Sequence, residues 1–544
     1  MHCQLEILRY CLPPSVRRTL EELPESLDKT YERILKEIKK PNRYHAHRLL
    51  QCLVVAIRPL TVEELTEVLA VDFDDTEGIP RLNAGWRWEH QEQALLSSCS
   101  SLIAIVNDNY SRVVQFSHFS VKEFLTSPRL ATPSRDISRY HIDLEAAHTI
   151  LGQACLGVLL RLDDHVDKNS VGQSFPLVQY AARYWVSHAQ YKDVSTCLRK
   201  GMEYLFDLDK PHFAMWLTVY DIDTLPNDTS IFSMFRSIVE YDASPLYYAA
   251  LCGFHGLVEH LIIKYPQHVN ASGGYYVRPL VAALAGEHFQ TSQLLHHNGA
   301  NPNVQGNRKI TPLHSAAYCG HVGVVQKLIE YGAIIDSEDQ DGMTPLCLAS
   351  EGIYLEDPYV LQLLLAHGAD IHAAAEDGST SLHRASTQGS LKVACLLLEH
   401  GANVEAKDGW GKTPLHHASR RGHFQAAHLL LEHGANIEGR DGWGETPLHH
   451  ASHYGSLKAA WLLLEHGANV DAEDGWGKTH LNHASRRRHL EVEHLLLEHG
   501  ANAEEKGVPG ETPLRHVSRS GYLVVARVLL LGLARLLLAR LWRK

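Results

Sequence analysis

The chain has 544 residues, of which 45% are hydrophobic and 21% are charged, and its formal net charge is −12. This length predicts at least two folding units, and the ordinary composition is typical of a folded protein. The acidic balance argues against a protein devoted to nucleic acid, which needs a basic surface. The 10 cysteines include no Cys-x-x-Cys pair, so neither a zinc ribbon nor a disulfide framework is expected.

The first 130 residues predict several helices followed by a β-hairpin. Apolar residues recur at helical spacing in 27–38 and 46–57, and a further helix is expected at 91–98. Thr61-Val-Glu-Glu64 has the form of a capping box at a helix start. Two apolar segments, 102–106 and 112–116, flank a polar turn and predict the hairpin. Helices followed by a hairpin are typical of a winged helix.

The residues of this winged helix do not favour DNA binding. The candidate recognition helix at 89–98 carries Glu89 and Glu92 and contains neither lysine nor arginine. Phosphate contacts supply most of the affinity for nucleic acid, so this surface has the wrong sign of charge. We therefore expect no nucleic-acid partner.

Three segments of this region resemble the part of fungal NACHT–ankyrin proteins, which are NOD-like receptors, that follows the NTPase core. They are Leu27-Asp-Lys-Thr-Tyr-Glu-Arg-Ile-Leu35, Arg58-Pro-Leu-Thr-Val-Glu-Glu-Leu65 and Phe116-Ser-His-Phe-Ser-Val-Lys-Glu-Phe-Leu125. The resemblance implies a remnant of the post-NACHT segment at 1–22, a winged-helix domain at 23–130 and a helical spacer at 131–240. It also implies a contact of His118 with nucleotide or with the core, although a structural role as a buried histidine stays open.

The resemblance leaves two origins for the chain. No P-loop or Walker B strand precedes the three segments, so the chain is either a receptor derivative without its NTPase core or a fragment of a complete NACHT NTPase. The spacer itself shows apolar helical stretches at 151–160, 180–185 and 213–220, and we find no chemistry in it.

From residue 241 onwards, a pattern of 33 or 34 residues repeats to the end of the chain. Lys412-Thr-Pro-Leu-His-His-Ala-Ser419 recurs as Glu445-Thr-Pro-Leu-His-His-Ala-Ser452. Nine such starts occur, near Ser244, Arg278, Thr311, Thr344, Thr380, Thr413, Thr446, Thr479 and Thr512, and three extra residues fall within 353–359. The pattern resembles the ankyrin repeat, so we expect a mainly α protein in which residues 241–544 form a solenoid of about nine repeats.

Each repeat contains its own start and stop signals. Thr413 can cap the first helix, Pro414 occupies its first turn and Gly422 ends it. The resemblance implies a hydrogen bond between the threonine and the histidine of the motif, which assigns a structural role to His314, His383, His416 and His449. Repeat eight has Asn482 in place of that histidine and Arg488 in place of the glycine, so its first helix is expected to end less sharply.

The abundant histidines suggest metal ligands and the Gly-Lys-Thr turns suggest a nucleotide-binding loop, but neither pattern fits such a site. A second series of histidines lies one residue after the motif-histidine position in successive repeats: His417, His450, His483 and His516. Equivalent residues of stacked helices lie about 8–10 Å apart, too far to share an ion with bonds of about 2.0–2.1 Å. Gly411-Lys412-Thr413 ends like a P-loop, but Ala406 stands where the first glycine is needed. We expect no metal, no nucleotide cofactor and no ATP hydrolysis.

The near-identical repeats differ at positions that predict a partner-binding surface. Six differing residues lie near the end of the first helix, and the ankyrin resemblance assigns them to the concave face: Arg420, Arg421, His453, Tyr454, Arg486 and Arg487. Three further candidates occupy the hairpin tips: Trp410, Trp443 and Trp476. Each tryptophan contacts either a partner or the neighbouring hairpin. Trp, Tyr and Arg are the residue types that dominate binding hot spots. We therefore expect a non-enzymatic recognition protein whose partner is a protein that is acidic where it meets the arginines.

The last 22 residues, 523–544, are mostly apolar, but their pattern does not predict a membrane anchor. Arg527, Arg535 and Arg540 interrupt the run, and each arginine costs about 2.5–3.5 kcal/mol at a bilayer centre. A C-terminal helix that caps the solenoid is expected instead. The N-terminus has no signal-peptide pattern, so a cytoplasmic location is expected.

Overall fold

The structure is a computed structural model, and it describes residues 27–73, 79–108, 111–131, 137–162, 171–223, 243–274, 276–352 and 358–502. The chain divides into two compact units, Met1–Ala300 (unit 1) and Asn301–Lys544 (unit 2). Several predicted features lie outside the described residues, namely the remnant at 1–22, most of the insertion at 353–359, the ninth repeat with His516, and the cap helix.

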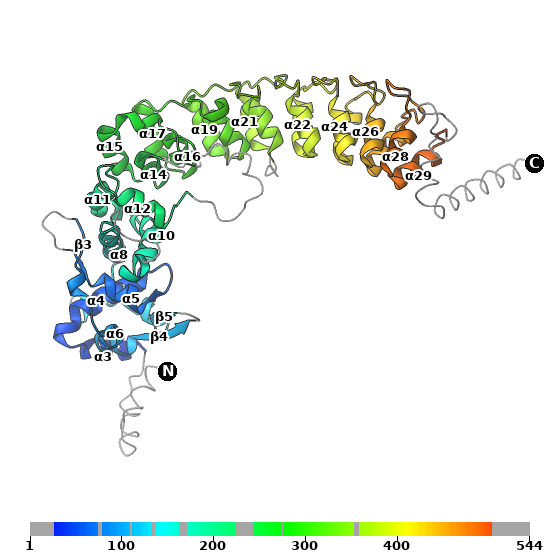
Figure 1. Cartoon of the computed structure of the whole chain (residues 1–544). Helices are drawn as coiled ribbons and strands as arrows, with labels where there is room; N and C mark the ends of the chain where they lie inside the picture. Colours follow the sequence, from blue (N-terminus) through cyan, green and yellow to red (C-terminus); the bar gives the residue numbers. More distant parts are fainter. Residues whose placement is uncertain are drawn as a thin grey trace, which may run out of the picture. The chain divides into compact units, whose positions relative to one another are not determined.

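Unit 1 begins with short helices around a three-stranded antiparallel sheet (Figure 1). The helices are α3 (Leu27–Glu37), α4 (Arg43–Val55), α5 (Val62–Val68), α6 (Gln91–Cys99) and α7 (Ser120–Thr126). The sheet has the order β1-β5-β4, built from β1 (Leu60–Thr61), β4 (Ile103–Asp108) and β5 (Ser111–Phe116). A second antiparallel pair joins β2 (Val71–Asp72) to β3 (Arg81–Leu82).

The local signals of the winged helix are confirmed in the structure. The β4–β5 hairpin places Ile105 opposite Val114. The capping box also forms, because the Glu64 N–H donates to Thr61 Oγ1 at 3.1 Å and the Thr61 N–H donates to Glu64 Oε2 at 2.8 Å. Both signals act over a few residues, so the sequence alone was enough to predict them.

The helical spacer and the first two repeats complete unit 1. The spacer helices are α8 (Leu144–Leu159), α9 (Val171–Ser174), α10 (Val178–Ala189), α11 (Val194–Leu205) and α12 (His212–Val219). The repeat helices are α14 (Pro245–Leu251), α15 (His255–Lys264), α16 (Pro279–Ala285) and α17 (Phe289–His297). Helix α11 packs on α15, and the Trp185 ring lies 5.5 Å from the Phe254 ring, centroid to centroid. The first repeat therefore shares a core with the spacer, and this is why the compact division falls at residue 300 and not at the start of the repeat pattern.

Unit 2 is a series of helix pairs that stack in chain order (Figure 1). The described pairs are α18 (Pro312–Tyr318) with α19 (Val322–Glu330), α20 (Pro345–Glu351) with α21 (Tyr359–Ala366), α22 (Ser381–Gln388) with α23 (Leu391–Glu399), α24 (Pro414–Arg421) with α25 (Phe424–Glu432), α26 (Pro447–Tyr454) with α27 (Leu457–Glu465), and α28 (His480–Arg487) with α29 (Leu490–Glu498). Leu430, Leu463 and Leu496 are fully buried at equivalent positions of the second helices. Each repeat thus buries its leucines against its neighbours, as in a solenoid.

The expectation that the first helix of repeat eight ends less sharply is wrong. Helix α28 has 8 residues, the same length as α24 and α26. Arg488 takes the left-handed conformation, with φ 63°, that Gly422 and Gly455 adopt with φ 74° and 72°. The stacking of the repeat overrides the preference of arginine, at a conformational cost of about 1 kcal/mol.

Replacing Arg488 with glycine is therefore expected to increase stability. The variant Arg488→Gly should raise the free energy of unfolding by about 0.5–1 kcal/mol, because glycine adopts a positive φ without strain. Urea unfolding of the full chain measures the change. Arg487→Gly, one residue earlier and inside the helix, is the control and should lower stability by about 0.5–1 kcal/mol. A neutral or destabilising Arg488→Gly would contradict the strain argument.

Candidate protein-binding surface

The histidine of each repeat motif ties its own helix to the next hairpin. The Thr413 hydroxyl and His416 Nδ1 lie 2.8 Å apart, and the Thr413 N–H donates to the same nitrogen at 3.1 Å. On the other side of the ring, His416 Nε2 lies 3.1 Å from the Glu445 carbonyl oxygen of the following repeat. The same two contacts are made by His314, His383 and His449. The predicted threonine–histidine bond is confirmed, and the link to the next repeat is an addition that only the structure shows.

The hairpin tips are held by backbone contacts that leave the tryptophan rings outside. The Gly442 N–H donates to the Trp410 carbonyl at 2.8 Å, and the Gly475 N–H donates to the Trp443 carbonyl at 2.9 Å. The residues Trp410, Trp443 and Trp476 are 48%, 39% and 59% exposed. Lys412 Nζ lies 4.6 Å from the centroid of the Trp443 ring. The rings are therefore reachable by a partner, and one of them already carries a cation from the preceding repeat.

The residues at the ends of the first helices make contacts across neighbouring repeats. The Arg420 guanidinium lies 4.7 Å from the Tyr454 ring centroid, so α24 and α26 join through a cation–π contact. His453 Nδ1 lies 3.3 Å from His483 Nδ1, which joins α26 to α28. Burial, and then the charge of Arg487, lower the pKa of His453 to about 4, so this ring is neutral at pH 7.

The four arginines of this group are available for a partner. Arg420 is half-buried, and Arg421, Arg486 and Arg487 are exposed. In the part of the chain that the structure describes, none of the four forms an ion pair with an acidic side chain. All four lie in the last turn of a helix, where the helix dipole favours a cation. We call Arg420, Arg421, His453, Tyr454, Arg486 and Arg487 the arginine strip.

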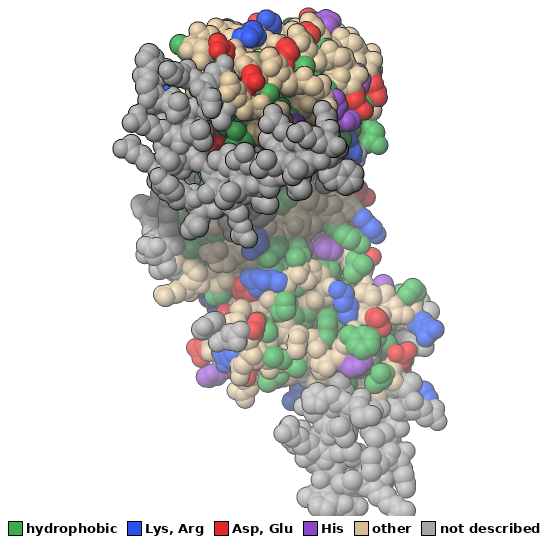
Figure 2. Space-filling model, turned by 90° about the vertical axis from the view of Figure 1, so that its right-hand side faces the viewer, with side chains coloured by type: hydrophobic (Ala, Val, Ile, Leu, Met, Phe, Trp, Pro, Cys, Tyr) green, Lys and Arg blue, Asp and Glu red, His purple; other side chains and the backbone are tan. Residues whose placement is uncertain are grey.

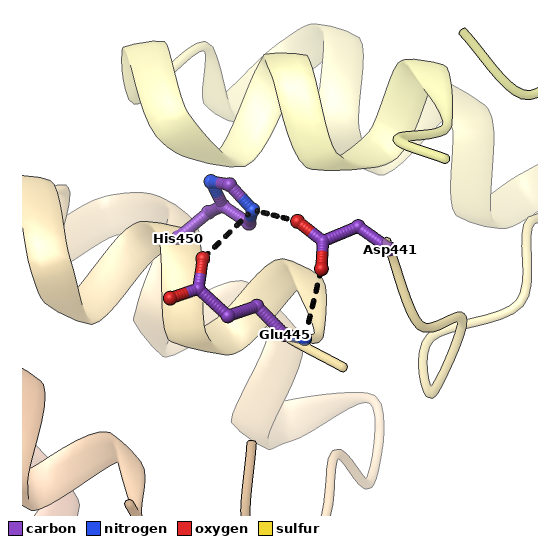
Figure 3. A group of neighbouring side chains, drawn as sticks. All are labelled: Asp441, Glu445 and His450. Carbon is purple, nitrogen blue, oxygen red and sulfur yellow. Dashed lines mark hydrogen bonds and ion pairs between the residues drawn. The ribbon is translucent and has the colours of Figure 1, made fainter. Parts of the chain in front are cut away.

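The second series of histidines forms a set of pairs that sequence analysis missed. His417, His450 and His483 each place Nε2 2.9 Å from a carboxylate oxygen of the hairpin aspartate in the same repeat, Asp408, Asp441 and Asp474 respectively. The wide spacing expected between equivalent histidines of different repeats does not exclude a metal at these mixed pairs, or at Glu445, which lies beside His450 (Figure 3). A signal was present in the sequence, because each aspartate precedes its histidine by nine residues in all three repeats.

The winged-helix surface places its basic residues beside acidic ones. Arg112 on β5 reaches Glu92 Oε2 at 2.6 Å and Glu63 Oε1 at 3.2 Å. On the face drawn in Figure 2, Lys and Arg side chains likewise lie among Asp and Glu side chains. His118 is half-buried, and its Nδ1 hydrogen-bonds to Ser120 Oγ at 2.7 Å. The structure thus shows a local partner for His118. Among the described helices, none combines the length and the hydropathy needed to span a bilayer.

Comparison with known proteins identifies both kinds of domain. A family model for ankyrin repeats matches in three copies, at residues 280–375, 354–408 and 382–474. The model for the winged helix domain of GPI inositol-deacylase matches residues 31–134. These matches agree with the helix pairs and with the helix-and-hairpin order that the structure describes.

Several curated proteins share part of this chain. The azaphilone pigments biosynthesis cluster protein L of Monascus ruber is 32% identical over 299 residues, which cover 52% of this chain and 61% of that protein. The ARF GTPase-activating protein Git of Drosophila melanogaster is 40% identical over 73 residues, or 13% of this chain and 10% of that protein. A putative ankyrin repeat protein of Fowlpox virus is 30% identical over 138 residues, or 24% of this chain and 40% of that protein.

The chain covers less than two thirds of the length of each of these relatives. Ankyrin repeats suggest a scaffold for protein–protein interaction, and the ankyrin-repeat relatives suggest a non-enzymatic protein. The chain is a mainly helical protein that combines a winged-helix domain of the GPI inositol-deacylase type with an array of ankyrin repeats.

Proposed function

We propose that this chain is a non-enzymatic recognition protein whose arginine strip binds an acidic segment of a partner protein. The observation that supports the proposal is the set of four arginines that carry no ion pair with a described acidic residue, on a chain of net charge −12. A local charge opposite to the global one steers acidic partners to this place and repels basic ones.

The contacts of the strip favour recognition over a purely structural role. The Arg420–Tyr454 contact orders one arginine in advance, which lowers the entropy lost when a partner binds. Arg421, Arg486 and Arg487 are exposed and contribute little to the packed core. Replacing such surface residues should change stability by about 0.5 kcal/mol or less, whereas truncating a true hot spot costs about 2 kcal/mol of binding energy.

Peptides selected on the full chain from a random display library are expected to be rich in Asp and Glu. Their affinity should fall as salt rises, because exposed charges are screened. The double variants Arg420→Ala/Arg421→Ala and Arg486→Ala/Arg487→Ala should each weaken binding about 30-fold or more, which corresponds to about 2 kcal/mol.

The matched control is Lys392→Ala/Lys458→Ala, which removes the same charge from the second helices and should leave the affinity within about twofold of the wild type. Selection of basic or neutral peptides would contradict the proposal. Undiminished binding by folded arginine variants would do the same and would move the site to the tips at Trp410, Trp443 and Trp476.

We also propose that the chain derives from a NOD-like receptor. The winged-helix match and the order of winged helix, helical spacer and ankyrin repeats support this origin. The alternative function is that of a fragment of a complete NACHT NTPase, in which the ankyrin array would act as the sensor. The coding sequence upstream of Met1 separates the two, because an in-frame P-loop there would favour the fragment.

A cytoplasmic location is likewise proposed. The free cysteines support it, since eight described cysteines form no disulfide and five of them are buried.

A further inference from the structure

One position in the array departs from its neighbours in charge. Glu445 stands directly before the Thr-Pro-Leu-His motif, where the adjacent repeats have Lys412 and Lys478. Its backbone is held as theirs is, because its carbonyl accepts from His416 Nε2 and from the Asp441 N–H. Only the side chain differs, and it introduces a carboxylate between two of the aspartate–histidine pairs.

The Glu445 carboxylate directs its two oxygens to different pairs. Oε2 lies 3.3 Å from His450 Nε2, and Oε1 lies 3.9 Å from His483 Nε2. His450 Nε2 also lies 2.9 Å from Asp441 Oδ2 (Figure 3). The ligand atoms of Asp441, Glu445 and His450 all fall within 4.8 Å of one another, and the same holds for Glu445, Asp474 and His483.

The aspartates of the cluster are oriented by the hairpins before any ligand binds. Asp441 Oδ1 accepts from the Trp443 N–H and the Glu445 N–H, each at 2.9 Å, which leaves Oδ2 facing His450. Asp474 makes the equivalent bonds to Trp476 and Lys478. Such outer contacts are what hold carboxylate and imidazole ligands in place around protein-bound metals.

Burying neighbouring carboxylates costs free energy, because like charges repel more strongly away from water. The Asp441 side chain is 0% exposed, His450 4% and Glu445 15%. Two carboxylates and one imidazole therefore meet where little solvent can screen the negative charges. A divalent cation among these side chains would compensate the carboxylates.

We propose that Asp441, Glu445 and His450 form a binding site for a divalent transition-metal ion of the zinc class. Zinc accepts one imidazole nitrogen and carboxylate oxygens at about 2.0–2.2 Å, so ligand atoms in a tetrahedral site lie about 3.3–3.6 Å apart. The separations of 3.3 Å and 2.9 Å are within about half an ångström of that spacing. Water would complete the coordination, and the ion would fasten the hairpin of repeat seven to the first helix of that repeat.

Among the three similar repeats, the shorter distances place the site in repeat seven. Asp408 and His417 in repeat six are just as close, at 2.9 Å, but Lys412 stands where the third ligand is needed. Asp474 and His483 face the other oxygen of Glu445 at the longer distance of 3.9 Å. The histidines of repeats six and eight, His417 and His483, therefore provide matched control positions for the proposed site.

Zinc binding to the metal-stripped full chain tests the proposal, with competition against a chromophoric chelator as the readout. Glu445→Lys should weaken binding at least tenfold, and its fold should survive because Lys412 and Lys478 occupy the equivalent position. His450→Gln should weaken binding similarly. His417→Gln and His483→Gln should leave the affinity within about twofold of the wild type.

Cobalt substitution provides a readout at the ligands themselves. The wild type should show the visible absorption of Co²⁺ bound by nitrogen and oxygen, and Glu445→Gln, which keeps the shape of the side chain, should lose it. Equal zinc affinity in the wild type, Glu445→Lys and His450→Gln would overturn the proposal. A loss confined to His483→Gln would also overturn it, because the ion would then belong to Asp474 and His483.

Discussion

Replacing Trp216 with alanine is expected to destabilise unit 1 by about 3–5 kcal/mol. The side chain is fully buried, and its Nε1–H donates to the Ala182 carbonyl at 2.9 Å. Its ring lies 5.3 Å from Trp185 and 6.1 Å from Tyr248, centroid to centroid, so it contacts both the spacer and the first repeat. Truncation removes buried apolar surface, leaves a cavity and removes a hydrogen bond to a buried carbonyl.

The effect should be confined to unit 1 and should spread through the spacer–repeat core. Hydrogen exchange of the full chain, followed by mass spectrometry, should show faster exchange in α10, α12 and α14, with the second helices of unit 2 unchanged. Trp86→Ala is the control, because this tryptophan is 50% exposed and should contribute less than about 1 kcal/mol. A loss below about 1 kcal/mol for Trp216→Ala would show that this core is not cooperative.

Acidification is expected to destabilise the repeats through the buried motif histidines, and His383 is the clearest case. Burial, and then the neighbouring His417, lower the pKa of His383 to about 4, while Asp408 acts in the opposite direction. The unfolded chain takes up this proton near pH 6.5, whereas the folded chain does so only near pH 4. Stability is therefore fully present above pH 6.5 and is lost as the pH falls from 6.5 to 4, by about 3 kcal/mol for this residue.

The variant His383→Asn should reduce this pH dependence. Asparagine is already present at the equivalent position of repeat eight, where Asn482 Nδ2 donates to Thr479 Oγ1 at 2.7 Å. At pH 7 the variant should lose about 1 kcal/mol, because the contact of His383 with the Lys412 carbonyl is gone. Between pH 7 and 4 its stability should fall by about 3 kcal/mol less than that of the wild type. Parallel pH profiles in urea unfolding would show that His383 does not set the acid sensitivity.

Several structures that depend on close neighbours in the chain were predicted from the sequence. The Thr61–Glu64 capping box, the β4–β5 hairpin and the Thr413–His416 bond each involve residues only a few positions apart or a single tight turn. The period of the repeat also predicted the stacked helix pairs, since each repeat has apolar faces that only a neighbouring repeat can cover.

Contacts between repeats were harder to predict because they depend on how the helix pairs stack. The arginine strip was located from differences between near-identical repeats, but the Arg420–Tyr454 and His453–His483 contacts needed the structure. The backbone conformation of Arg488 also could not be predicted without the stacked repeats. Arginine alone does not favour a positive φ, and the packed repeat imposes it.

By itself, the sequence determined the classes of domain, the number of repeat starts and the capping roles of Thr61 and Thr413, because these follow from local hydrogen bonding and hydrophobic period. Only the tertiary structure decided that the first two repeats form one compact unit with the spacer, since that depends on which aromatic rings pack together. It also decided that Glu445 lies between two aspartate–histidine pairs from neighbouring hairpins. The physical reason is that a carboxylate shared between repeats requires a fixed stacking distance, and side-chain packing sets that distance in three dimensions.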